Sequence, residues 1–504
     1  MRYARTTHVH LGISVASVVL AVFLACGHAP SNNFAGASGA RGGSAGSAGF
    51  GLGGAGSSAG GGVGGAALAG TAGTLMGGAA GASGTCPRHC GPRYEELFDN
   101  GKLATLRITF AESTLGGANW LDMLWQKWKH CPPHDNYVPV QMSYESPDGK
   151  GDVTLENVGM RLRGSMLRSV NDLQGFKLDF QALAGPAGPE GKRRFGDLNR
   201  LNTLSIEDDP SHLVQCLAYK ALRDFGLPAP RCNHLMVYVN GAYYGLMEHA
   251  EQADNRGFLR RHFGANAGNL YAASPSAAAC GWQDSLARLE YSGDTFTGAY
   301  TKAYQLVRAT TAEAEQNLIP MLKCGDATAT PDEATFKACI SEWLDVDEWL
   351  RQIAAESLMP SLEAFIGYQR NYFLYFKPDS SAPRGGRFLV WSWDLDTSFV
   401  YQRCSPSSCN VNSAVSNLYK ATRPKLVQRL TTVYKAEYCA ALKRFLSDIY
   451  KPELVDDMAN VIRPGMTAEP TVTLAAWESA VAQVRGYIVQ HAADMQTAVA
   501  TACN

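Results

Sequence analysis

Alternating hydrophobic and polar positions dominate the first part of the chain after residue 86. They predict strands over five segments: Leu103–Phe110, Asn136–Tyr144, Asn157–Arg163, Gly175–Phe180 and Leu201–Ile206. The proline inside Asn136–Tyr144 indicates an edge strand or a bulge, because proline cannot donate a ladder hydrogen bond. Two further alternating runs, His234–Val239 and Ala242–Glu248, flank Asn240-Gly241 and therefore predict a β-hairpin.

Helical spacing of hydrophobic residues begins between these strands and dominates the later part of the chain. One helix is predicted from Pro210, its first position, to Phe225, with Asp209 as its cap and Gly226 after its end. The other predicted helices are Asn255–Phe263, Asp294–Ala309, Thr311–Leu322, Asp332–Trp349 with its continuation to Leu358, Pro424–Val433, Ala436–Tyr450, Pro452–Val461 and Leu474–Val499. A strand pair, Asn371–Lys377 and Arg387–Trp393, interrupts them. The order predicts an α+β fold.

The segment Arg387–Val400 combines a buried strand with two acidic residues, Asp394 and Asp396. If the strand continues to Asp396, its period of two places both carboxylates on one face. Paired carboxylates suit a hard divalent cation, which prefers oxygen ligands. An aspartate-rich turn that closes a core strand explains the same residues.

The first residues predict export and a membrane anchor. Met1–Ala25 has a basic start, an apolar run over Leu11–Leu24, and Ala25-Cys26 at its end, as in a signal peptide. Phe23-Leu24-Ala25-Cys26 resembles a bacterial lipobox, in which the cysteine is lipidated after cleavage. A plain cleaved signal is the alternative. Residues 26–85, rich in Gly, Ala and Ser, are predicted to be a flexible tether before a globular part at 86–504.

The cysteines agree with export, to the periplasm or the cell surface. The chain has 13 cysteines, and twelve remain without Cys26. Several disulfides are therefore expected. Cys86 and Cys90, like Cys404 and Cys409, favour disulfides over metal binding, because no second Cys/His pair stands at the spacing of a zinc site.

The overall charge excludes no protein partner but gives no reason to expect nucleic acid. The formal net charge is −1 over 504 residues, of which 46% are hydrophobic and 18% charged. Binding to nucleic acid normally needs a strong positive excess. The sequence identifies neither the substrate protein nor the oligomeric state.

Several motifs, taken together in order, resemble one protein family. They are VGMRLRGSMLRS with GFKLDF, LNTLSIEDDPSHLVQCLAYKALRDFGLPAPR, VYVNGAYYGLMEHAEQADNRGFL, QRNYFLYF and FLVWSWDLDTSF. This succession resembles the CotH family, which is related to spore coat protein H and comprises atypical protein-kinase-like proteins. The resemblance spans roughly residues 103–499. It divides the globular part into a β-rich half, about 86–283, and a helical half, about 284–504.

The resemblance implies phosphorylation of protein Ser or Thr with ATP and Mg²⁺ or Mn²⁺. Lys177 matches the lysine that contacts ATP phosphates, although a lysine on a sheet surface is the alternative. Arg161, Arg163 and Gly164 match a turn that binds phosphate, followed by Ser165 as part of a small polar run. Such a turn offers backbone N–H groups and positive charge to an anion.

The acidic residues carry the metal and catalytic expectations of the resemblance. Asp394 matches the first acid of a W-D-x-D motif and is expected to bind the metal, with Asp396 as a second ligand or an orienting group. Asn371 is either a metal-side ligand or a structural residue that opens a strand. Glu251 either supports Lys177 or faces solvent.

One departure from the family pattern concerns the catalytic base. Counting back from Asn371, the position of the expected aspartate holds Glu363, and Ser361 replaces an expected asparagine. The extra methylene moves the carboxylate by roughly an ångström, and such a displacement can cost about 10²-fold in rate. A non-catalytic surface display or adhesion module, or a pseudokinase on the same fold, is therefore the alternative to an active kinase.

Overall fold

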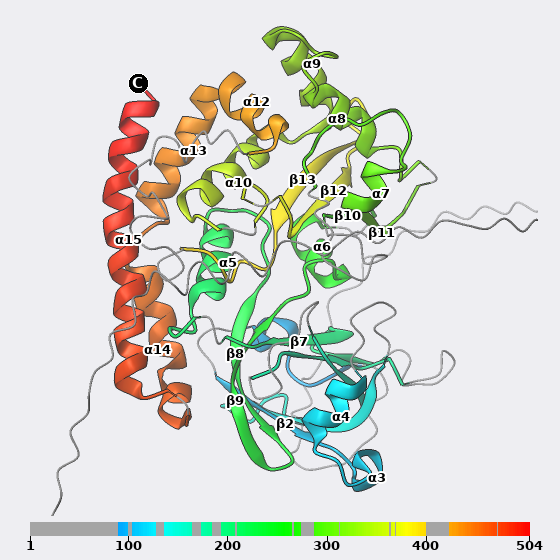
Figure 1. Ribbon diagram of the computed structural model, residues 1–504, viewed down its shortest axis with the longest axis vertical. Helices are drawn as coiled ribbons and strands as arrows, with labels where there is room; N and C mark the ends of the chain where they lie inside the picture. The colour runs from blue at the N-terminus through cyan, green and yellow to red at the C-terminus, as the bar shows by residue number, and fades with distance from the viewer. Residues whose placement is uncertain are drawn as a thin grey trace, which may run out of the picture. The chain divides into compact units, whose positions relative to one another are not determined.

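The computed structural model describes residues 89–98, 103–127, 136–163, 173–183, 193–206, 209–264, 267–273, 287–311, 313–361, 364–367, 369–399, 423–470 and 472–504. All of them belong to one unit of the chain, Leu75–Asn504. Within these ranges the fold is mixed α+β, with a β-barrel in the first half and a helical C-terminal region (Figure 1). The predicted fold class is confirmed.

Alternation places the hydrophobic residues of the first half inside a closed barrel. Its strands follow the order β2 (Ala104–Thr109), β3 (Val138–Glu145), β4 (Val153–Leu162), β5 (Phe176–Asp179), β7 (Arg200–Leu204), β9 (Ala242–Ala250) and β8 (Cys232–Val239). Parallel pairing of β2 with β8 closes the barrel, and the other neighbours are antiparallel. Side chains such as Leu106, Met160 and Phe176 fill it.

Each barrel strand predicted from alternation is present, with small shifts of its ends. Pro139 lies in β3, which pairs on both sides, so the edge-strand alternative is wrong. The pairing of β3 with β4 shifts register just after it, between Val140 and Met142, as a bulge requires. Asn240 and Gly241 have φ of 49° and 80°, the conformation of a tight hairpin turn.

A second sheet lies in the later half, in the order β11 (Tyr304–Arg308), β10 (Asn269–Ala273), β12 (Tyr372–Pro378) and β13 (Gly386–Ser392). Its pair β12–β13 was predicted, but β10 was not. The predicted helix Asp294–Ala309 is wrong over β11. Only α7 (Ala299–Ala303) is helical there, and the next five residues form β11, which pairs with β10.

Helix α5 (Val214–Asp224) packs against the barrel strand β8, and eight of its residues are buried. It starts later than predicted, so Pro210 does not occupy its first turn. The Asp209 carboxylate nevertheless accepts hydrogen bonds from the N–H groups of Leu213 and Val214, both at 2.8 Å. Asp209 thus satisfies the free donors at the helix start.

The helical region surrounds the second sheet and α5 (Figure 1). Its helices are α6 (Arg256–Phe263), α8 (Leu318–Gly325), α9 (Glu333–Trp343), α10 (Val346–Leu358), α12 (Lys425–Val433), α13 (Lys435–Asp448), α14 (Glu453–Ala468) and α15 (Leu474–Ala502). One hydrophobic core joins α5, α10, α13, α14 and α15. The smaller elements are β1 (His89–Cys90), paired with β6 (Arg194–Phe195), and α2 (Tyr94–Leu97), α3 (Glu112–Leu115) and α4 (Trp120–Lys127).

Three disulfides join separate elements in the described part of the chain. The pairs are Cys216–Cys232, Cys324–Cys339 and Cys439–Cys503, and Cys90 is also disulfide-bonded. They suggest an extracytoplasmic protein. Cys86, Cys404 and Cys409 lie outside the described residues.

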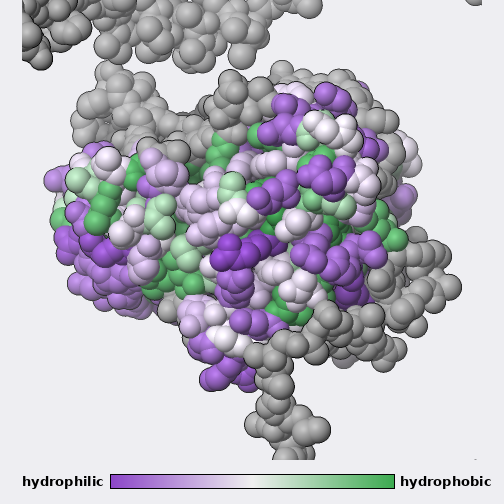
Figure 2. All heavy atoms as spheres, turned by 90° about the horizontal axis from the view of Figure 1, so that it is seen from below, coloured by the Kyte–Doolittle hydropathy of each residue, from purple (hydrophilic) through white to green (hydrophobic). Residues whose placement is uncertain are grey.

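In the described ranges, no helix has both the length and the apolar character to cross a bilayer. The face seen from below mixes hydrophilic and hydrophobic residues (Figure 2).

Candidate functional site

The strand pair β12–β13 brings Asn371 and Asp394 together. Antiparallel pairing aligns Tyr372 with Ser392, so the residue before β12 lies beside the residues after β13. The Trp393 N–H donates to the Asn371 carbonyl at 2.9 Å, and the Asn371 side-chain amide lies 3.5 Å from the Asp394 carboxylate. Two predicted metal-side residues therefore lie in contact.

Both residues have a backbone that most L-residues avoid. The φ of Asn371 is 56° and that of Asp394 is 58°. Asn and Asp tolerate this left-handed region better than most residues, and such conformations often cluster at functional sites. Strand β13 ends at Ser392, so the condition that it continues to Asp396 is wrong. The turn, rather than a strand period, sets the directions of the two carboxylates.

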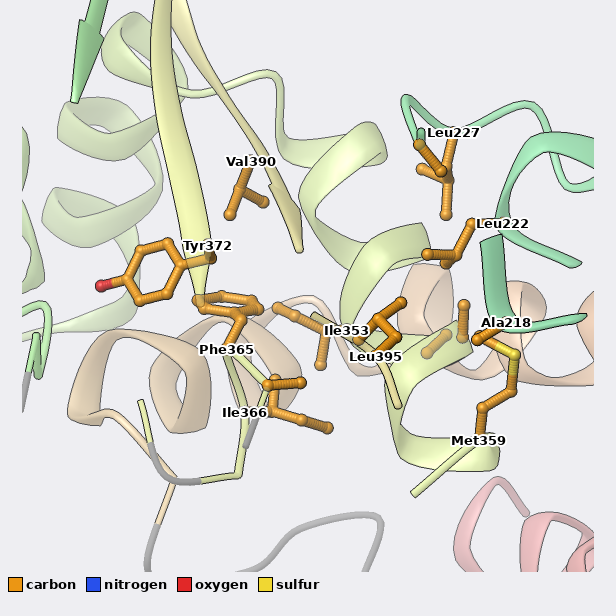
Figure 3. Close-up of a cluster of buried hydrophobic side chains, with 14 of the residues drawn as sticks. Ala218, Leu222, Leu227, Ile353, Met359, Phe365, Ile366, Tyr372, Val390 and Leu395 are labelled. Atoms are coloured by element: carbon orange, nitrogen blue, oxygen red, sulfur yellow. The ribbon is translucent and has the colours of Figure 1, made fainter. Parts of the chain in front are cut away.

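Leu395, between the two acids, anchors this turn in the core. It is only 1% exposed. Its side chain lies between Ile353 of α10 and Ala218 of α5 (Figure 3). The Asp394 N–H also donates to the hydroxyl of Tyr219 on α5, at 2.9 Å. The acidic turn is therefore held by a hydrophobic side chain and by a hydrogen bond to α5.

Asp396 lines a small cavity with other acidic and polar side chains. The cavity measures about 30 Å³, and its polar lining includes Asp209, Gln215 and Glu248. Glu248 is 2% exposed, and Gln215 donates to its Oε2 at 2.8 Å. Burial, then the negative charges of Asp209 and Asp396, raise the pKa of Glu248 to about 8. A space of this size holds about one water molecule, so it is not itself a nucleotide pocket.

A second group of ligand-type atoms lies behind this cavity. Atoms of Cys216, His234 and Glu248 lie within 4.8 Å of one another, and all three residues are buried. Cys216 forms a disulfide with Cys232, so its sulfur cannot act as a thiolate ligand. The His234 Nε2–H donates to the His212 carbonyl at 2.7 Å. This group is structural in the disulfide-bonded form.

Lys177 projects from the outer face of the barrel into a basic environment. Its neighbours along β5, Phe176 and Leu178, point into the barrel core. Lys177 pairs with Arg161 of β4 on one side and with Asn202 of β7 on the other. Burial, then the positive charges of Arg161, Arg163 and Arg200, lower the pKa of Lys177 to about 7.

Arg163 links the lysine electrostatically to the acidic turn. It follows β4, where its N–H donates to the Gly175 carbonyl at 2.9 Å. Its positive charge lowers the pKa of Lys177 and also acts on the Tyr219 hydroxyl that binds Asp394. Arg161 stacks over the Tyr137 ring at 5.5 Å. The charge of Arg163 thus acts both on Lys177 and on the hydroxyl that holds the acidic turn.

Glu251 was expected either to support Lys177 or to face solvent, and its observed contacts match neither arrangement fully. Its side chain is completely buried, so the solvent-facing alternative is wrong. The carboxylate pairs with Arg261 and accepts the Arg231 N–H at 3.1 Å, and burial raises its pKa to about 7. The carboxylate that acts on Lys177 is Asp254, three residues later. Sequence reasoning missed Asp254, although it stands in the same HAEQAD segment.

The remaining predicted site residues are Ser165, Glu363 and Cys26, which lie outside the described residues. The chain on either side of Glu363 is described. The Ser361 hydroxyl lies 3.1 Å from that of Thr397, the residue after Asp396. The Ile366 N–H donates to the buried carboxylate of Glu356, which also accepts a hydrogen bond from Ser392 at the end of β13. Glu356, another residue that the sequence did not single out, ties these segments together.

The comparison with protein families identifies one family. The model of the CotH kinase protein family matches residues 160–495. That range contains Arg161, Lys177, Asn371, Asp394 and Asp396. A search of curated proteins gave no match.

Proposed function

The chain belongs to the CotH kinase protein family, and from this premise we propose that it transfers a phosphoryl group from ATP to Ser or Thr of a protein. Family membership suggests a kinase-like function that uses ATP. The observation that carries the proposal further is the Asn371–Asp394 contact, which α5 supports through Tyr219. Oxygen atoms from an Asp and an Asn at paired strand ends suit Mg²⁺ or Mn²⁺.

The basic face of the barrel is suited to phosphate. Lys177, Arg161 and Arg163 carry like charges that disfavour one another, as the lowered pKa of Lys177 indicates. A triphosphate would offset this repulsion and accept hydrogen bonds from the same groups. The turn after Arg163, with Ser165, would add backbone N–H donors. Glu251 would hold Arg261, and with it helix α6, in position through their ion pair.

Asp394, Asp396 and Asn371 would hold the cation. When bound, it would supply positive charge against the phosphate oxygens of ATP. Tyr219 and Leu395 keep the turn fixed, so little reorganisation is required of the carboxylates. Asp394 lies beside Asn371, so it is the stronger candidate for direct contact with the cation. Asp396 lines the cavity next to Glu248, so it is the stronger candidate for orienting the acidic turn.

Glu363 would serve as the base. The substrate hydroxyl oxygen would bond to the γ-phosphorus while the bond to the leaving ADP oxygen breaks, and the hydroxyl proton would pass to the Glu363 carboxylate. The Ser361–Thr397 contact supports this role, because it fixes the chain just before Glu363 beside the acidic turn.

Export through residues 1–25 and lipidation of Cys26 complete the proposal. The protein would then be held at a membrane, on the periplasmic side or at the cell surface, by the tether 26–85. Disulfides in the folded part support an oxidising compartment.

The test compares the wild type with Lys177→Met and Asp394→Asn. Asparagine suits the second position because it tolerates the φ of 58° while removing the charge. Lys443→Met, at an exposed position on α13, is the matched control. We expect ATP with Mg²⁺ to raise the unfolding temperature of the wild type and the control, and to raise it much less in the two site variants.

Transfer of radiolabel from ATP to the protein itself is measured in parallel. Loss of transfer in both site variants supports the proposed site, and unchanged transfer in both eliminates it. Stabilisation by ATP without any transfer would identify a pseudokinase. A folded wild type that ATP does not stabilise would favour the display or adhesion module.

A further inference from the structure

Four arginines from three elements form a basic surface that includes the outer side of helix α6. They are Arg194 of β6, Arg256 and Arg260 of α6, and Arg308 of β11. Arg256 and Arg260 are exposed, and the other two are partly buried. None of the four forms an ion pair with a residue in the described ranges. One buried nitrogen of Arg194 and one of Arg308 also lack a hydrogen-bond partner there.

Helix α6 presents Arg256 and Arg260 rigidly. Asn255 caps the helix by accepting the Gly257 N–H at 2.9 Å, and Gly264 ends it with a φ of 70°. On its apolar side, Phe258 and Phe263 lie 5.2 and 5.6 Å from the Trp391 ring of the second sheet. Arg256 and Arg260, four residues apart, therefore share the outer side of the helix.

The four side chains act as one electrostatic group. Burial and the charges of Arg256 and Arg260 lower the pKa of Arg194, and burial and Arg256 lower the pKa of Arg308. Arg256 is therefore near the arginines of both neighbouring strands. The negative charge of Asp254, two residues before Arg256, acts both on Arg308 and on Lys177 of the proposed site.

We propose that Arg194, Arg256, Arg260 and Arg308 bind an acidic segment of the protein substrate. The inference rests on the proposed function, since it names what the kinase would recognise. Guanidinium groups bind carboxylates in a two-pronged geometry, and four of them on three elements can engage successive acidic residues. The chain as a whole has a net charge of only −1, so the positive charge is local rather than general. A segment bound here would place a neighbouring hydroxyl beside the nucleotide.

The test measures peptide binding without ATP, so it does not depend on catalysis. A short fluorescein-labelled peptide of serine and glutamate is titrated with the full chain, and a peptide with glutamine in place of glutamate is the neutral probe. We expect the wild type to bind the acidic peptide, with affinity that falls as salt rises. Arg256→Glu/Arg260→Glu should weaken binding by about tenfold or more, because charge-assisted contacts are replaced by repulsion.

Lys435→Glu/Lys443→Glu is the matched control, since it changes the net charge equally at exposed positions of α13. Its affinity should stay within about twofold of the wild type, as expected for charges beyond the screening length. Arg256→Lys/Arg260→Lys should retain part of the binding, and thermal unfolding checks that each variant is folded.

The docking site would be overturned if the wild type bound the acidic and the neutral peptide equally well. It would also be overturned if the Lys435→Glu/Lys443→Glu control lost as much affinity for the acidic peptide as the arginine variant. So would variants that lose binding to anionic vesicles while peptide binding is unchanged, since the surface would then face a membrane. Peptide binding that depends on the arginines, in a protein that transfers no phosphate, would leave the docking site in place and refute the kinase activity alone.

Discussion

At the scale of single residues, Lys177 has the most informative environment. Its pKa of about 7, against the usual 10.5, reflects burial and three neighbouring arginines. At pH 8 the Lys177 side chain is therefore neutral in most molecules before the ligand binds. Triphosphate would favour the charged form and raise the pKa, so ATP binding should take up a proton between about pH 7 and 9.

Isothermal titration in two buffers of different ionisation enthalpy measures this uptake. We expect the wild type to absorb a substantial fraction of one proton at pH 8 and clearly less at pH 6, where Lys177 is already charged. Lys177→Met should abolish the difference between buffers. An uptake that is the same in the variant would assign the proton to another group and contradict the role of Lys177.

The sequence predicted some of these residues and not others, for physical reasons. Asp394 could be singled out because it follows a strongly patterned strand, and Asn371 because it stands in one of the motifs that resemble the family. Glu248 could not, since its burial depends on α5 and on Asp396, far apart in the chain. The arginine that pairs with Glu251 was equally hidden, because ten residues and a chain reversal separate them.

At the scale of secondary-structure elements, α5 connects the barrel to the acidic turn. The Cys216–Cys232 disulfide joins it to β8, and the Tyr219 hydroxyl accepts the Asp394 N–H at 2.9 Å. Tyr219→Phe removes that acceptor. We expect a loss of about 1–3 kcal/mol in the free energy of unfolding, as for other buried donors left unpaired, together with a smaller stabilisation by ATP and Mg²⁺.

Tyr300→Phe is the matched control. The Tyr300 hydroxyl also accepts a backbone N–H, that of Ser292 at 2.6 Å, but in α7 rather than beside the acidic turn. Its stability should fall comparably while the effect of ATP stays unchanged. If both variants lost the ATP effect equally, α5 would have no special role in positioning Asp394.

Most elements could be predicted from periodicity, and the exceptions depend on distant partners. Residues 304–308 continue a helical pattern but become β11, because β10 offers them an open edge. Pro210 was expected to begin α5, yet the following residues form a turn in which His212 has a φ of 57°. Local preference decides such short segments only when no tertiary partner competes.

At the scale of the whole molecule, the disulfides suggest an extracytoplasmic protein, and the proposed anchor would hold such a protein at a membrane. Cys439–Cys503 ties α13 to the end of α15, and Cys216–Cys232 and Cys324–Cys339 secure other helices. These three bonds lie in the family-matched part of the chain or just beyond its end. The folded part should therefore keep its structure and its ATP binding without the lipid.

Cys26→Ala tests the anchor separately from the chemistry. Each buried methylene of a lipid chain contributes about 0.8 kcal/mol to membrane binding, so two or more acyl chains hold a protein stably and their loss releases it. We expect the variant to move from the membrane fraction to the soluble fraction, while ATP with Mg²⁺ still raises its unfolding temperature as in the wild type. A variant that stays with the membrane would contradict lipidation at Cys26. A released variant that ATP no longer stabilises would show instead that the lipid anchor contributes to ATP binding, and the anchor and the chemistry could then not be treated separately.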